Sequence, residues 1–68
     1  MIRMIDAKDV TPGMIVYYST HSAPVTVSSV EHDVPRYAKR VTVVSGEDTN
    51  GVPITLDCHP EFVFMIHA

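Results

Sequence analysis

Cys58 and His59 are adjacent residues whose side chains together could do nucleophilic or metal chemistry. A thiolate beside an imidazole is the pair that cysteine nucleophiles use, and both groups are zinc ligands. Neighbouring residues of a strand point to opposite faces, so the pair shares a site only if the chain turns between them. The sequence holds no second cysteine and no pair of histidines four residues apart. We therefore predict that Cys58 is a packed core or rim residue.

The remaining histidines and carboxylates are scattered along the chain. His21, His32 and His67 lie near expected loops or near the end of the sequence, where we expect solvated side chains. Asp57 and Glu61 flank an expected corner and are predicted to cap it by accepting backbone N–H donors. A carboxylate pair that does acid–base chemistry needs a cleft, and so short a chain has little room for one. We expect no enzyme activity, no metal site and no cofactor.

Arg36, Tyr37, Lys39 and Arg40 form a cluster of basic and aromatic residues. Arginine and lysine contact phosphates and a tyrosine ring stacks on bases, so the cluster is a candidate nucleic-acid contact. Alternatively, the basic side chains flank a strand and guard its edge, or they meet an acidic protein surface. Nucleic-acid affinity comes largely from a basic surface, whereas this chain has a net charge of -3. Nucleic acid is therefore the less favoured partner.

Large apolar side chains gather in the first well-defined strand and in the last one, and both strands are apolar on both faces. One face of each must fill the core, and the other is either covered by a neighbouring element or exposed. An exposed patch of aromatic and methionine side chains is typical of an interface. The alternative is that the N-terminal residues 2–5 cover it. The candidate interaction residues are Tyr17, Tyr18, Phe62, Phe64 and Met65.

The composition favours strands over helices. Val, Ile and Thr make up 22 of the 68 residues, and branched side chains pack well on a pleated surface. No apolar stripe with helical spacing runs for ten residues. Pro53 cannot donate to a ladder, which predicts an edge position for its strand. The expected strands are 14–19, 25–30, 39–45, 52–57 and 62–66, and residues 1–8 form either a short edge strand or an arm.

Turn signals separate these strands. Pro12-Gly13 predicts a type II turn, and Asn50-Gly51 is a strong hairpin signal. The alternation breaks phase at Ser28-Ser29, where we predict a bulge. Residues 31–38 hold a proline and mixed charges and are expected to form a loop, and residues 58–61 a tight corner. We therefore expect one all-β domain over residues 1–68, a strongly bent meander or barrel of five or six strands.

The order of turns and strands resembles the Src-homology-3-like small barrels, including the KOW and Tudor types. The resemblance is topological, and it rests on residues 10–16, the hairpin 41–56 and the corner 58–61 before Phe62. Such barrels bind peptides or nucleic acids or act as scaffolds, so the resemblance alone implies no single function. The chain departs from the peptide readers because it has no tryptophan, and from the ribosomal KOW modules because it lacks their basic surface.

Size and charge lead to an expected function. A core of this size rarely supplies more than about 3–5 kcal/mol, and self-association would add further stability. The sequence has no signal-peptide pattern, no membrane-length apolar run and a single thiol, from which we expect a cytoplasmic protein. Its small size and acidic, Val/Thr-rich composition resemble those of small accessory proteins encoded by bacteriophages or mobile elements. A phage origin would place the protein in the host cytoplasm. We predict a non-catalytic protein-interaction or assembly module, and as the alternative a nucleic-acid binder that uses Arg36–Arg40.

Overall fold

A computed structural model describes residues 2–17 and 23–67 of the chain. Tyr18 and His21 therefore lie outside the described residues. The described residues form six strands and one single-turn 3₁₀ helix. Their bounds are β1 Ile2–Asp6, η1 Ala7–Asp9, β2 Ile15–Tyr17, β3 Val25–Arg36, β4 Lys39–Glu47, β5 Pro53–Cys58 and β6 Val63–His67.

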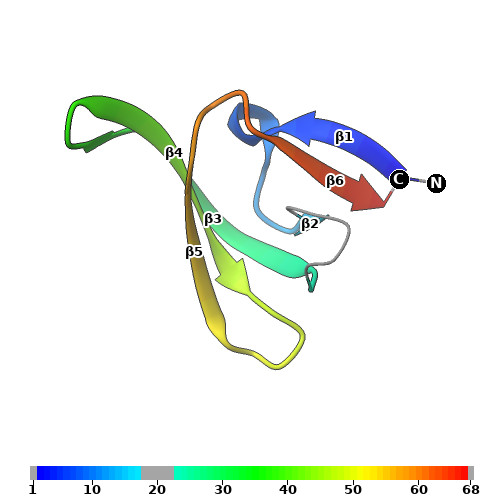
Figure 1. Cartoon of the computed structure of the whole chain (residues 1–68). Helices are drawn as coiled ribbons and strands as arrows, with labels where there is room; N and C mark the ends of the chain where they lie inside the picture. The colour runs from blue at the N-terminus through cyan, green and yellow to red at the C-terminus, as the bar shows by residue number, and fades with distance from the viewer. Residues whose placement is uncertain (1, 18–22, 68) are drawn as a thin grey trace.

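The strands form one antiparallel sheet in the order β1-β6-β2-β3-β4-β5. The consecutive strands β2 to β5 form a meander, and β6 returns to lie between β1 and β2. The sheet is strongly bent, with the long β3–β4 hairpin curving away from the end that holds β1 and β6 (Figure 1). The edge strands β1 and β5 do not pair with each other, so the sheet is open. The expected all-β fold is confirmed as a bent meander, and it does not close into a barrel.

The N-terminal segment and the Pro-Gly turn follow the sequence signals. Residues 2–6 form an edge strand, which pairs with β6 from Ile2↔His67 to Asp6↔Val63. The Met14 N–H donates to the Thr11 carbonyl across the predicted turn at 3.3 Å, and Gly13 has a φ of 95°. This φ lies in the left-handed region that the third residue of a type II turn requires, and glycine adopts it without strain.

The β4–β5 hairpin also forms at the predicted place. Gly51 has a φ of 78°, and its N–H donates to the Asp48 carbonyl at 3.1 Å. The Asp48 carboxylate accepts the N–H groups of Asn50 at 2.8 Å and Val52 at 3.0 Å, which fixes the turn. Because Asp48 starts the turn, β4 runs two residues further than expected, to Glu47.

Pairing along β3 confirms one expectation and overturns another. The register with β4 shifts between Val27 and Ser29, where the sequence predicts a bulge. The expected loop at 31–38 is wrong: β3 continues to Arg36, and Arg36 pairs with Lys39 across a two-residue turn. A second register shift lies between Glu31 and Val34, and it hides the strand alternation in the sequence. Pro35 is tolerated because it lies beyond the part of β3 that pairs with β2, so one side of the strand needs no donor.

The hydrophobic core gathers residues from β2, β3, β4, β5 and β6 and from the segment around η1. Phe64, Val16 and Val44 are fully buried and come from β6, β2 and β4. The other buried residues packed with them are Ala7, Val10, Val25, Val27 and Cys58. β3 and β4 approach very closely at Gly46, where an added Cβ would collide with the Thr26 backbone carbonyl. Only glycine fits that position, although its backbone conformation is ordinary.

Candidate interaction surface

The two faces of the sheet differ sharply at the β1-β6-β2 end. Residues directly opposite each other in an antiparallel pair share a face. The register therefore places Ile5 with Phe64 on the inner face and Met4 with Met65 on the outer one. β2 continues this pattern, because Tyr17 pairs with Met65. The alternation places Ile2, Met4, Asp6, Ile15, Tyr17, Val63 and Met65 on this side. The six apolar residues among them, Ile2, Met4, Ile15, Tyr17, Val63 and Met65, are called the outer face below.

The outer face is apolar and largely exposed to solvent. Met4 is 71% exposed and Ile2 60%, and Ile15 and Val63 are also exposed. Tyr17 and Met65 are half-buried. An open hollow of about 440 Å³ adjoins the outer face at β2, lined in part by Ile15, Tyr17 and Pro24. The three strands thus carry an apolar surface that is bordered by Asp6 at the end of β1.

The sequence-based interaction residues divide between this surface and the core. Tyr17 and Met65 lie opposite each other on the outer face. Phe62 lies just before β6 and is 40% exposed, and its ring meets that of Phe64 edge to face at a centroid distance of 5.0 Å. Phe64 itself is fully buried and therefore cannot reach a partner. Its inclusion was wrong because alternation along β6 turns it to the inner face.

The N-terminal residues extend the outer face and do not cover it. β1 lies beside β6 in the sheet (Figure 1). It adds the exposed side chains of Ile2 and Met4 to the outer surface. The sequence reasoning missed these two residues, together with Ile15 and Val63. A strand assignment for 2–6 would have found Ile2 and Met4, because Ile5 alternates with them and packs against the core.

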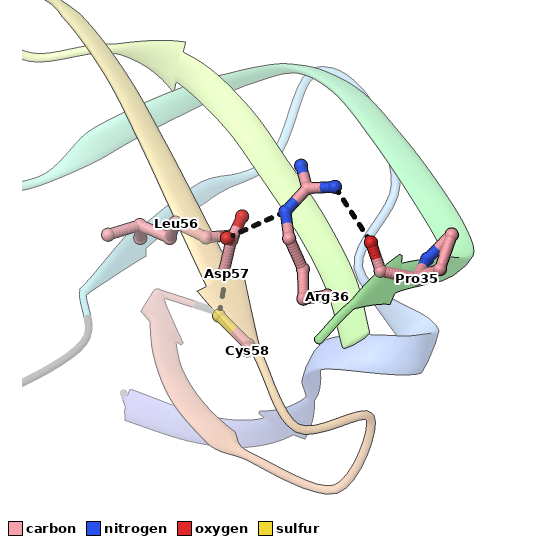
Figure 2. A network of polar contacts seen from close by, with 5 residues as sticks. All are labelled: Pro35, Arg36, Leu56, Asp57 and Cys58. Atoms are coloured by element: carbon pink, nitrogen blue, oxygen red, sulfur yellow. Dashed lines mark hydrogen bonds and ion pairs between the residues drawn. The ribbon is translucent and has the colours of Figure 1, made fainter. Parts of the chain in front are cut away.

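The basic cluster lies at the tip of the β3–β4 hairpin, far along the sheet from the outer face. The Arg36 Nε donates to the Asp57 carboxylate of β5 at 3.1 Å, and its Nη1 donates to the Pro35 carbonyl at 3.1 Å (Figure 2). Arg40 Nη1 donates to the Asp33 carbonyl at 3.1 Å. Two of the three basic groups are thus engaged within the chain. This is the arrangement expected of side chains that support the hairpin.

Two features of the hairpin tip remain accessible. Tyr37 is completely exposed and has a φ of 55°, which is an uncommon conformation for a residue with a large side chain. A hollow of about 550 Å³ lies beside the tip, lined by Lys39, Arg40, Val41, Asp57 and His59. The hollow joins basic side chains of β4 to the corner after β5.

Cys58 and His59 do not form a shared site, because Cys58 ends β5 with its side chain buried and His59 follows it with its side chain exposed. Cys58 is buried in the core, where its thiol lies 3.7 Å from the Leu56 carbonyl (Figure 2). Burial, followed by the neighbouring Asp57 charge, raises the pKa of the Cys58 thiol above its usual value of 9.0. His59 is exposed, and its Nδ1 accepts the Glu61 N–H at 3.1 Å. This arrangement does not activate the thiol, and it gives His59 a role in fixing the corner.

Metal-ligating side chains do not gather within residues 2–17 and 23–67: these ranges hold no group of three or more His, Cys, Asp or Glu suited to a metal ion. The same ranges contain no helix with the length and apolarity needed to cross a membrane. Comparison with known proteins gave no match, since no family model fits the sequence and no curated protein or solved structure matches it significantly. The function is therefore inferred from the surface residues of the chain itself.

Proposed function

We propose that the chain is a non-catalytic protein-interaction or assembly module that binds its partner through the outer face. The observation that carries the proposal is the row of apolar side chains across β1, β6 and β2, of which Met4 is 71% exposed. Contiguous apolar surface in contact with water is unfavourable and is typical of interfaces. Methionine and tyrosine are among the residues that interface cores favour.

The shape and chemistry of the outer face support a protein partner. Ile2, Met4, Ile15 and Val63 carry no charge, and the half-buried Tyr17 and Met65 lie between them. A nucleic acid would need unpaired basic groups at this surface, whereas the charged pair at its border is the Asp6 carboxylate, opposite Val63, with Lys8 at 4.0 Å. We also propose a relationship to the Src-homology-3-like barrels, because turn, strand, bulged strand, hairpin and tight corner follow in the expected order.

Affinity capture from the cells that encode the chain tests this function. A variant that combines Ile15→Lys with Val63→Lys places charges on the outer face at two exposed positions. Val52→Lys is the matched control, because Val52 is equally exposed but lies in the β4–β5 turn. We expect a partner that wild type and Val52→Lys retain and the double variant loses. A partner captured equally by all three proteins would refute the proposal.

The hollow at the hairpin tip supports a second candidate function, the binding of an anionic group such as a nucleic-acid phosphate. Lys39, Arg40 and His59 lie around it, and Tyr37 is fully exposed nearby. The engagement of Arg36 by Asp57 and the net charge of -3 oppose this function. If the hollow has this function, the protein should bind single-stranded oligonucleotides at low salt. The combined substitution Lys39→Ala with Arg40→Ala should weaken that binding at least tenfold. No binding at low salt would exclude it.

A further inference from the structure

The two edges of the sheet are not equally protected against pairing with another strand. On β5, the residues whose backbone groups point away from β4 run from Pro53 to Asp57. Pro53 has no N–H to donate, and the Asp57 carboxylate forms an ion pair with Arg36. Proline and charge are the usual means by which natural proteins blunt an edge strand. β1 has no proline, and although it carries Arg3 and ends at Asp6, the exposed Ile2 and Met4 on its outer face are apolar. β1 is thus the edge that another strand can join.

The hydrogen-bond phase of β1 shows which backbone groups are available for pairing. The Ala7 N–H donates to the Phe62 carbonyl at 2.7 Å and continues the β1–β6 ladder. Bonded and non-bonded pairs alternate in an antiparallel ladder, so Ile5 and Arg3 are the bonded residues of β1. Ile2, Met4 and Asp6 consequently direct their N–H and C=O groups away from β6. No strand of the described residues lies on that side.

We propose that a second copy of this chain pairs with β1 edge to edge, antiparallel, with Met4 opposite the second copy's Met4. In this register Ile2 faces the second copy's Asp6, and the outward groups of all three residues find partners. A shift of two residues in either direction leaves one of them unpaired, and one such shift also sets Arg3 against the second copy's Arg3. Like charges directly opposite each other are destabilising. The Met4-centred register is therefore the favoured one.

A second copy is the occupant that these features favour over an unrelated strand. The outward residues at 2, 4 and 6 are spaced symmetrically about Met4, so two identical strands offer each other matching groups, with the carbonyl of Asp6, the N-cap of η1, as an acceptor shared with that helix. A chain of 68 residues buries only about 60% of its unfolded surface, and pairing adds buried area without further sequence. Pairing between two copies rests on the proposed function, which assigns partner binding to this end of the sheet. Pairing would join two outer faces into one continuous surface.

Disulfide trapping tests the register directly. Opposed Cα atoms in a bonded antiparallel pair lie about 5.5 Å apart, which suits a disulfide. Met4→Cys should therefore give a covalent dimer under mild oxidation. Ile2→Cys is the matched control: it is also exposed, but two copies of Ile2 lie four residues apart along the strands, or about 13 Å. Crosslinking of Met4→Cys alone is expected. Equal crosslinking of both variants, or of neither, overturns the proposal.

Sedimentation of charge variants provides the second test. Met4→Lys and Met4→Glu should each be monomeric at concentrations where wild type dimerises, because like charges meet at the centre of the pair. An equimolar mixture of the two variants should regain the dimer, and Val52→Lys should dimerise as wild type does. A strictly monomeric wild type at millimolar concentration, or a mixture that stays monomeric, overturns the inference. The proposed function would survive either result if host partners were still lost on the Ile15→Lys, Val63→Lys variant.

Discussion

Phe64 and Phe62 are neighbouring rings whose replacement by alanine should have very different effects on stability. Phe64 is fully buried, and a buried Phe→Ala substitution costs about 3–5 kcal/mol through lost transfer free energy and the cavity left behind. Phe62 keeps 40% of its surface exposed, so its truncation loses roughly half of the burial and its edge-to-face contact with Phe64. That loss corresponds to about 1–2 kcal/mol.

The consequence is large because the chain is small. A domain of 68 residues has a free energy of unfolding of roughly 3–10 kcal/mol. Phe64→Ala should thus remove a third to all of it, whereas Phe62→Ala should leave a folded protein with a Tm lowered by about 4–16 °C. Urea and thermal unfolding, followed by circular dichroism at one fixed protein concentration, measure both. Equal losses in the two variants, or a larger loss for Phe62→Ala, would refute the assignment of Phe64 to the core and Phe62 to its rim.

Three further predictions concern single positions. Gly46→Ala should lower the free energy of unfolding by about 1–3 kcal/mol in denaturant titration, because the new methyl group meets the Thr26 carbonyl; a neutral effect would contradict the close approach. Tyr37→Gly should raise stability by about 0.5–1 kcal/mol, since glycine relieves the positive φ and the exposed ring has no contact to lose; a loss of stability would show that the ring is bound. The Cys58 thiol should react with a disulfide reagent at pH 8 far more slowly than a free cysteine, because burial raises its pKa. The unfolded chain releases this proton near pH 9 while the folded chain retains it, so stability should fall as the pH rises above about 9.

Local signals in the sequence predict most of the fold. The turns at Pro12-Gly13 and Asn50-Gly51 are confirmed because each needs a positive φ that glycine supplies at the right place. The bulge at Ser28-Ser29 is confirmed because a break in alternation is itself the signal. The continuation of β3 through 31–36 is not predictable in the same way. Its second bulge and Pro35 imitate a loop, and the pairing with β4 that holds them is a long-range contact.

The candidate surface is predictable only in part, for a related reason. Tyr17 and Met65 are correctly associated with an apolar excess, but the face that each residue of β6 presents depends on its pairing with β1 and β2. Composition cannot distinguish Phe64 from Val63, although one is buried and the other exposed. The sequence left two alternatives open, an exposed face or one covered by residues 2–5. Ile2 and Met4 extend the face because β1 joins the sheet at its edge.

Photocrosslinking at two matched positions tests the central claim, that the outer face is where this protein meets its partner. Ile15 on the outer face is 49% exposed and Val52 in the β4–β5 turn is 50% exposed, so a benzophenone side chain at either site is equally accessible. Irradiation in the native cells should give discrete crosslinked species from position 15 and none from position 52. Equal crosslinking at both positions, or crosslinking from position 52 alone, would contradict the account.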